Sequence, residues 1–392
     1  MQDTFYPKDI WPTPHQTLLL RAALTPSAEA ITAWEEWVAA GCFDWPDRAS
    51  YRLLPLAYHN LKKQGYDAPV MGRLKGIYRR SWCKNQLLFR QFTALLQQVQ
   101  AAGIQTLALK GVVLSELYYR DHGVRPMGDL DLMIPLAEVP AAATLLVNSG
   151  WASKLRPLQW LNEYQLSVRH AWHFEDQERN VLDLHWHLLW EDCSAEADAD
   201  FWEGAVPAEI LGLTVLTLNP ADQLLHTCVH GARWNPTAPI RWVADGLTIL
   251  TQSPALDWER LLSQAEKRRL ILPVRETLRY LAAEFQAPIP PAVLAQLESL
   301  PVSLAERLEF RSKAISPDRK NILLTVWTDY RRYSRTARHR EPLRYLLGMP
   351  RYFQHCWAVA KWWTLPGYII RKSVKVATRR FWTLITDGSQ AG

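Results

Sequence analysis

The sequence predicts an α+β protein in which a small mixed β-sheet is flanked by helical regions. Three observations predict this class. Apolar residues recur at helical spacing through the first hundred residues. Short apolar or alternating segments then replace that spacing. Helical spacing returns after Asn219-Pro220. With 392 residues, 48% of them apolar and 21% charged, the chain is long enough for two or three folded units.

The N-terminal region, residues 1–102, is predicted to be mostly helical. Prolines interrupt residues 1–24, which we expect to wrap over another element. Thr25-Pro26 is typical of an N-cap followed by proline at the first helical position, so we expect a helix to begin there. The next helices are predicted at 48–64 and 85–102. Gly103 is suited to end the last of these helices.

The central region, residues 103–218, is predicted to hold the sheet. Residues 128–135 alternate between aspartates on one face and leucine or isoleucine on the other, which is typical of a strand. The other predicted strands are 104–109, 165–174 and 181–187. Helix-like segments are predicted at 112–119 and 137–149, with turns at 121–123 and 176–180.

The rest of the chain is predicted to be helical and to form two parts. Residues 219–300 form one helical domain, in which Asn219 and Asp257 are the predicted N-caps. Residues 301–392 form a basic C-terminal region that is rich in tryptophan and arginine and is interrupted by prolines.

Asp129 and Asp131 are the main candidates for catalysis. Residues two apart on a strand point the same way, so both carboxylates can bind one divalent cation. An exposed edge strand can carry the same alternating charges, and the pair alone leaves both interpretations open. Asp183 lies in a later predicted strand. Three carboxylates from two strands, beside a turn that can bind phosphate, favour two-metal phosphoryl chemistry.

The predicted phosphate-binding turn is Lys110-Gly111. It ends an apolar strand and begins a helix, which places backbone N–H groups where phosphates bind. Arg125 precedes the aspartate pair by four residues. It is a candidate for nucleotide binding, and an ordinary surface arginine is the alternative.

The run LALKGVVLSELYYRDHGVRPMGDLDLMIP, followed by VLDLHWHL, resembles the uncharacterised nucleotidyltransferase family of the polymerase-β-like superfamily. The resemblance extends through LLHTCVHGARWNPTAPIRWVADGLTIL and DWERLLSQA, and covers about residues 25–290. It implies a palm-like nucleotidyltransferase core in which Asp129, Asp131 and Asp183 hold two Mg²⁺ ions. It also implies that Lys110 and Gly111 bind the nucleotide triphosphate, although the superfamily at large has Gly-Ser or Gly-Gly there.

The function implied by this resemblance is the Mg²⁺-dependent transfer of NMP from an NTP to an unidentified acceptor. We expect the acceptor to be a small molecule or a peptide or protein, and residues 219–300 to close the cleft. The alternative is a catalytically inactive module of the same fold that binds or scaffolds a biosynthetic assembly. The intact cluster of Asp129, Asp131 and Asp183 argues against it, because an inactive protein gains nothing from three repelling carboxylates.

Four histidines are weaker candidates. His226 and His230 have the spacing of two zinc ligands, but the glutamate of HExxH is missing, which favours a helix end facing the cleft. By strand alternation, His185 and His187 share the face of Asp183. They either hydrogen-bond a carboxylate or substrate, or have a structural role.

Charge is distributed unevenly along the chain. Residues 331–392 contain 13 Lys and Arg against Glu341 and Asp387, a net +11, which leaves −5 for residues 1–330. We do not expect nucleic acid as a partner, because the candidate site lies in the acidic part. Residues 370–385 have an apolar stripe and a basic face, which predicts peripheral contact with an anionic membrane. A helix packed on its own domain is the alternative. With scattered cysteines and no leader pattern, we expect a cytoplasmic protein, peripheral to the membrane if this helix binds it.

Overall fold

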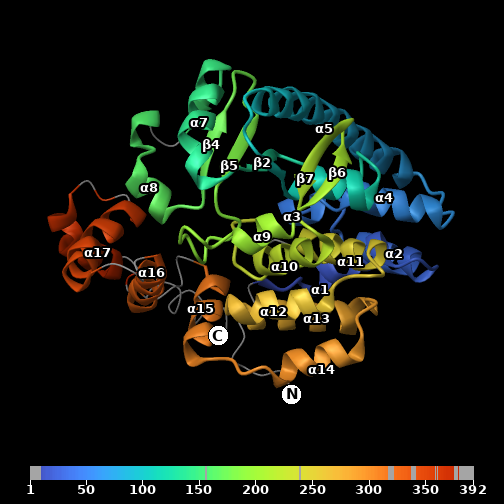
Figure 1. Cartoon of the computed structure of the whole chain (residues 1–392). Helices are drawn as coiled ribbons and strands as arrows, with labels where there is room; N and C mark the ends of the chain where they lie inside the picture. Colours follow the sequence, from blue (N-terminus) through green and yellow to red (C-terminus); the bar gives the residue numbers. More distant parts are fainter. Residues whose placement is uncertain are drawn as a thin grey trace.

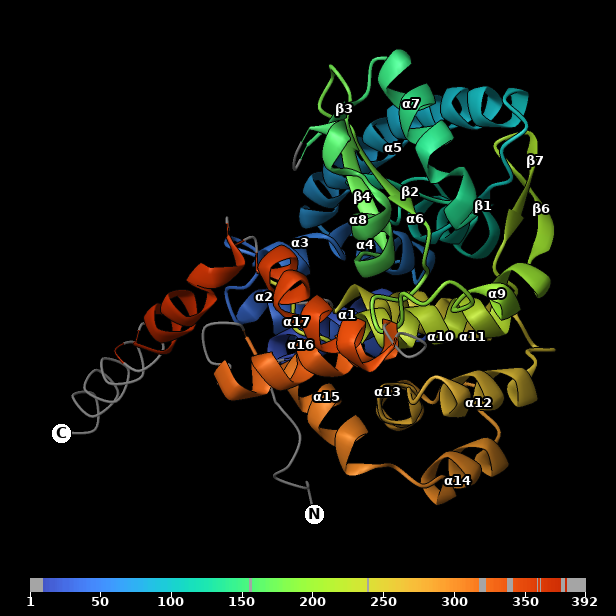
Figure 2. The ribbon, with the colours of Figure 1, turned by 60° about the vertical axis from the view of Figure 1, so that its left-hand side comes forward.

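The computed structural model describes residues 10–154, 157–237, 240–316, 322–336, 341–357, 359, 361–374 and 378. The molecule is α+β, as predicted, and its elements form tiers (Figures 1 and 2). The sheet and the long helix α5 form one tier, α10 and α11 lie beneath the sheet, and α12–α14 lie beyond them. Helices α16 and α17 lie to one side of these tiers.

One mixed sheet carries the candidate site. Its seven strands follow the order β3-β4-β5-β2-β1-β7-β6. Strand β2 pairs in parallel with β5 and antiparallel with β1, and β1 pairs in parallel with β7. The strands are β1 (Leu107–Ala108), β2 (Asp129–Met133), β3 (Ala152–Ser153), β4 (Ala171–Glu175), β5 (Val181–His185), β6 (Val206–Ile210) and β7 (Leu213–Thr217).

Helices precede the sheet strands in the sequence, lie between them and follow them. Those before the sheet and within it are α1 (Pro14–Leu24), α2 (Glu29–Ala39), α3 (Arg48–Tyr51), α4 (Leu54–Lys63), α5 (Val70–Ala101), α6 (Lys110–Val113), the π-helix η2 (Leu114–Tyr119), α7 (Val139–Asn148), α8 (Glu163–Val168) and α9 (Ala199–Glu203). Those after it are α10 (Pro220–Gly231), α11 (Arg241–Gln252), α12 (Trp258–Lys267), α13 (Ile271–Phe285), α14 (Pro291–Ser299), α15 (Leu304–Ala314), α16 (Ile322–Thr336) and α17 (Pro342–Cys356). Short 3₁₀ turns are η3 (Leu136–Glu138), η4 (Leu158–Trp160) and η5 (Trp362–Thr364).

One hydrophobic core joins the sheet to the helices before and after it. It includes Trp34 and Phe92 from the N-terminal helices, Leu132 from β2, and Leu225 from α10, all of them buried. A separate small cluster joins α8 to the C-terminal helices through Val168, Tyr333 and Tyr352. The sheet is therefore held rigidly by the same core as α10, which faces the candidate site.

The helix boundaries at the N-terminus differ from those predicted. Residues 14–24 form α1, capped by Thr13, whose side chain accepts a hydrogen bond from the Gln16 N–H. No helix was predicted within residues 1–24, and the Thr13-Pro14 pair starts one there. Thr25 is the C-cap of α1 and not an N-cap. In contrast, Asn219 and Asp257 cap α10 and α12 as predicted.

The prediction of a strand at 165–174 was wrong in its first half. The Asn162 side chain accepts a hydrogen bond from the Gln165 N–H and starts α8, so β4 begins only at Ala171. The hairpin of β6 and β7 was not predicted at all. Its two-residue turn has positive φ at both Leu211 (+54°) and Gly212 (+76°), as the tight turns of hairpins require.

Within the part of the chain that the structure describes, no helix is both long enough and apolar enough to cross a bilayer.

Candidate active site

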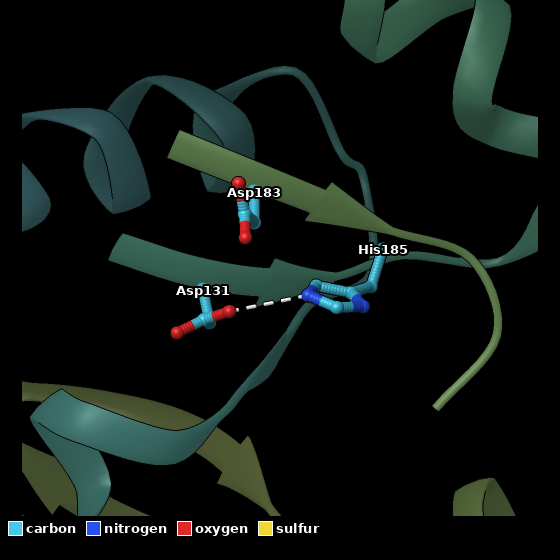
Figure 3. A group of neighbouring side chains, drawn as sticks. All are labelled: Asp131, Asp183 and His185. Carbon is cyan, nitrogen blue, oxygen red and sulfur yellow. Dashed lines mark hydrogen bonds and ion pairs between the residues drawn. The ribbon is translucent and has the colours of Figure 1, made fainter. Parts of the chain in front are cut away.

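Strands β2 and β5 bring two of the predicted carboxylates together. The strands are parallel and in register, with Asp131 opposite Asp183. His185 lies two residues after Asp183 and therefore shares its face of the sheet. One ligand atom from each of Asp131, Asp183 and His185 lies within 4.8 Å of the other two (Figure 3). This cluster has the donor atoms and spacing that a metal ion requires.

Each of the two carboxylates is fixed by neighbouring groups. Lys110 Nζ lies 2.5 Å from Asp131 Oδ1, and His185 Nε2 lies 3.1 Å from the same oxygen. His173 on β4 is the register partner of Asp183 and binds its carboxylate through Nδ1. These contacts hold both carboxylates on the same face of the sheet.

The electrostatics keep Asp131 ionised. Its side chain is only 2% exposed, and burial alone would raise its pKa, but the Lys110 ammonium and the His185 hydrogen bond outweigh burial and lower it. The charge of Asp131 in turn is the main cause that raises the pKa of Asp129. A cation that binds Asp131 Oδ1 therefore competes with Lys110 and relieves the repulsion between the aspartates.

Asp129 lies at the exposed start of β2, on the same face as Asp131 and opposite Val181. Among the described residues, it is not part of the group whose ligand atoms meet within 4.8 Å. Its role as a metal ligand stays a prediction. His185 joins Asp131 and Asp183 in this group, and strand alternation in the sequence had placed it on the face of Asp183.

The Lys110-Gly111 turn is tight and strained. Lys110 has φ +50°, a left-handed conformation that costs a residue with a side chain about 1 kcal/mol or more. A Cβ on Gly111 would lie 2.9 Å from Met127 Sδ and 3.1 Å from Arg125 Nη1, so a larger residue there would force these side chains to shift. The Lys110 side chain turns toward Asp131. Phosphate binding by the turn stays a prediction.

Arg125 lies inside the protein, not on the open face of the site. Its guanidinium makes a two-pronged ion pair with Asp245 of α11, with distances of 2.8 and 2.9 Å. The Tyr119 hydroxyl donates to the same carboxylate at 2.9 Å. Arg125 thus ties the segment before β2 to α11, and its contact with a nucleotide stays a prediction.

Helix α5 also fixes the segment before β2. The Asn85 side chain is fully buried and donates to the carbonyls of His122 (2.6 Å) and Arg125 (2.9 Å). Its Oδ1 accepts from the Met127 N–H at 3.1 Å. The aspartate strand is therefore positioned from two sides, by α5 and by α11.

Two further arginines, neither of them a predicted site residue, lie near Asp129. The charge of Asp129 acts on the pKa of both Arg52 and Arg241, although burial is the larger influence and lowers both. No carboxylate of the described residues lies within ion-pair distance of either one. Arg52 lies at the end of α3 and Arg241 begins α11. No sequence spacing connects either arginine to Asp129. They add positive charge on the Asp129 side.

A small pocket adjoins the site on its other side. Lys110, His185, His226, His230 and Arg233 line it together with His170. His226 and His230 of α10 thus line this pocket. His230 lies at the end of the helix, as expected when the HExxH motif was found to be incomplete. His187 does not join them, because it is buried and its Nδ1 lies 2.6 Å from Asp198 Oδ2.

A mixed sheet with carboxylates on neighbouring strands, beside a tight glycine turn, is the arrangement of metal-dependent phosphoryl transferases. The sequence model of the uncharacterised nucleotidyltransferase family matches residues 49–286, more than half of the chain. The chain belongs to this family, and the protein is a nucleotidyltransferase, as its motifs implied. No protein with a curated description matches the sequence.

Proposed function

We propose that the protein transfers NMP from an NTP to an acceptor in a reaction that depends on Mg²⁺. The observation that carries this proposal is the register of β2 and β5, which sets Asp131 beside Asp183. Asp129 lies on the same face of β2 and supplies a third carboxylate. The acceptor is a small molecule or a peptide or protein, because the part of the chain around the site is net acidic and unsuited to a nucleic-acid backbone.

The donor atoms fit Mg²⁺, which prefers carboxylate oxygens. Asp129, Asp131 and Asp183 would hold the ions, and His185 orients Asp131. Held there, Mg²⁺ would supply neutralisation of the phosphate charge and activation of the attacking hydroxyl. The chain's own residues do the rest. Gly111, Arg52 and Arg241 bind the triphosphate, and Asp183 takes the proton from the acceptor hydroxyl. The acceptor oxygen then bonds to the α-phosphorus as the bond to the β-phosphate breaks, and pyrophosphate leaves.

The alternative, an inactive binding or scaffolding module, predicts that the carboxylates have no chemical role. Such a module would keep the fold but would not need Asp131 ionised beside Asp183. The contacts of Lys110, His185 and His173 to these two carboxylates support the catalytic proposal.

The test is a labelling assay with Mg²⁺ and each α-labelled NTP, with and without cell extract as the source of acceptor. Asp131→Asn should reduce label transfer by about 100-fold or more while the fold survives, because a ligand carboxylate is lost. Asp67→Asn, which changes an exposed loop aspartate, is the matched control. Near-normal pyrophosphate release by Asp131→Asn would contradict the proposal. No transfer from any NTP by the unaltered protein would favour the scaffold.

We also propose that the C-terminal region contacts an anionic membrane. Helix α17 exposes three leucines at helical spacing, Leu343, Leu346 and Leu347, each more than 60% exposed. Trp362, Trp363, Ile370 and Val374 are exposed further along. Residues 370–374 of the helix predicted at 370–385 are helical, and most of the remainder lies outside the described residues. Apolar side chains among many Lys and Arg are typical of an interfacial segment.

A further inference from the structure

We propose that the pocket beside Asp131 binds a phosphate group carried by the acceptor. The proposal rests on the proposed function and names the chemical class of its second substrate, a phosphorylated compound. Lys110, His170, His185, His226, His230 and Arg233 form this acceptor pocket.

Charge is the first support. Arg233 is half-buried, and among the described residues no carboxylate lies within ion-pair distance of it. One carboxylate, that of Glu191, also lines the pocket, and it is paired with Lys313 at 2.7 Å. Lys110 is freed for the pocket once a cation binds Asp131. Two cations without a lasting partner match the nearly two negative charges of a phosphate monoester at pH 7.

Hydrogen bonding is the second support. Arg233 Nη2 donates to His230 Nδ1, so the remaining proton of a neutral His230 ring lies on Nε2 and is free to be donated. Burial lowers the pKa of His226 to about 3, and the nearby Arg233 charge, with burial, lowers that of His230 well below its usual value. Both rings are therefore neutral N–H donors near neutral pH. They can bind an anion without adding positive charge.

Two buried ring nitrogens without partners are the third support. His170 Nδ1 and His185 Nδ1 are buried, and neither has a hydrogen-bond partner among the described residues. Figure 3 shows this nitrogen of His185 on the ring edge away from Asp131. A buried polar atom without a partner costs free energy, so a polar occupant that reached these nitrogens would be stabilised there.

Position separates this pocket from the triphosphate. Neither Gly111 nor Asp129 lines it, whereas Lys110 and His185, which do, both contact Asp131. A nucleotide bound at Gly111, Arg52 and Arg241 would leave the pocket open. The acceptor's phosphate would then lie beside Asp131, with its attacking group directed toward Asp183.

The test measures binding of inorganic phosphate by calorimetry, in the presence of Mg²⁺, with and without a saturating non-hydrolysable NTP analogue. We expect the unaltered protein to bind phosphate in both conditions. Arg233→Gln should weaken binding about tenfold or more, and Arg233→Lys should restore part of it. Arg90→Gln, which removes an exposed arginine of α5, should change nothing. His230→Gln gives a second variant that keeps the arginine, and we expect it to weaken phosphate binding as well.

Each other outcome overturns the proposal and leaves the proposed function to its own assay. Displacement of phosphate by the NTP analogue would assign the pocket to the triphosphate. Acetate binding with the same dependence on Arg233, and no phosphate binding, would assign a carboxylate acceptor. Equal phosphate binding by folded Arg233→Gln and the unaltered protein, or no binding by either, would show that the pocket holds no anion.

Discussion

After the aspartates, Lys110 is the residue whose side chain contributes most contacts to the candidate site. It is the cation of the buried Asp131 carboxylate and also lines the acceptor pocket. One lysine therefore connects the metal-binding cluster to the second substrate. Its backbone is in the left-handed conformation, and its ammonium group lies against the Asp131 carboxylate.

Lys110→Met should lower the melting temperature in the absence of metal. Removing one partner leaves a buried carboxylate beside two others, which costs about 3 kcal/mol. Mg²⁺ should then raise the melting temperature of this variant more than that of the unaltered protein, because no lysine competes for Asp131. Thermal melts with and without Mg²⁺ measure both effects, with Lys110→Arg as the charge-preserving control. An unchanged melting temperature without metal would show that the ion pair contributes no stability.

Among single residues, the sequence predicted the neighbouring carboxylates of Asp131 and Asp183 but not what surrounds them. Spacing of two on a strand placed Asp131, and strand alternation placed His185 on the face of Asp183. No local pattern could place Arg52 or Arg241, because each reaches Asp129 from a helix distant in sequence. Arg125 was a candidate for phosphate contact, and its buried pairing with Asp245, 120 residues away, depends on tertiary packing.

Among the elements, the turn before β2 positions the aspartate strand. Asp121 accepts hydrogen bonds from the Gly123 N–H at 2.7 Å and from the Tyr78 hydroxyl of α5 at 2.9 Å. A Cβ on Gly123 would meet the Tyr78 ring at 2.3 Å, so glycine is required where the turn passes α5. The turn and the helix are thus locked together.

This lock predicts a pH dependence of stability. Burial opposes ionisation of Asp121, but hydrogen bonds from His59, Gly123 and Tyr78 outweigh it and lower its pKa to about 2. Because the folded-state pKa lies below the usual 3.8, the carboxylate stabilises the fold above about pH 4. That contribution is lost as the pH falls toward 2.

Asp121→Asn should therefore destabilise the protein at neutral pH by about 1–2 kcal/mol and flatten the loss of stability between pH 4 and pH 2. Denaturant unfolding at several pH values measures this slope. Asp67→Asn should keep the slope of the unaltered protein, since its aspartate is exposed in a loop. If Asp121→Asn and the unaltered protein lost stability with pH at the same rate, the turn contacts would not stabilise the Asp121 carboxylate.

The sequence predicted elements well where a local signal marked their ends. The strands at 128–135 and 181–187 correspond to β2 and β5, and Gly103 and Gly150 have the positive φ typical of helix ends. It failed where local signals compete. Gln165 follows an Asn162 cap, so α8 replaced part of a predicted strand. The hairpin turn has Leu211 at its first position, where Asn or Asp is the usual signal, and was overlooked.

In the whole molecule, the acidic residues 1–330 and the basic residues 331–392 form different parts of the structure. The acidic part holds the sheet and the core that joins it to α10. The basic part holds α17 and η5, with their exposed leucines and tryptophans. The proposed membrane contact and the proposed chemistry therefore lie in different parts of the chain.

Sedimentation with vesicles tests this division. The protein should pellet with anionic vesicles and not with neutral ones, and salt should weaken binding because each basic residue near the surface contributes about 1 kcal/mol that ions screen. Leu346→Gln with Leu347→Gln should weaken binding, as should Arg371→Glu. Leu87→Gln changes an equally exposed leucine on α5 and should not. Truncation after Gly367 should reduce pelleting while nucleotide transfer survives. Absence of binding by the intact protein would end the membrane proposal.

The order of strands in the sheet also has a consequence during synthesis on the ribosome. Strand β2 emerges with both of its aspartates, but its parallel partner β5 begins only at Val181. At roughly 5–20 residues per second, the nascent chain exposes this apolar, unpaired edge for about 3–10 seconds. The two-residue β1 must wait longer still, for β7 at residue 213. Newly made chains therefore expose the edge of β2 until β5 has been synthesised.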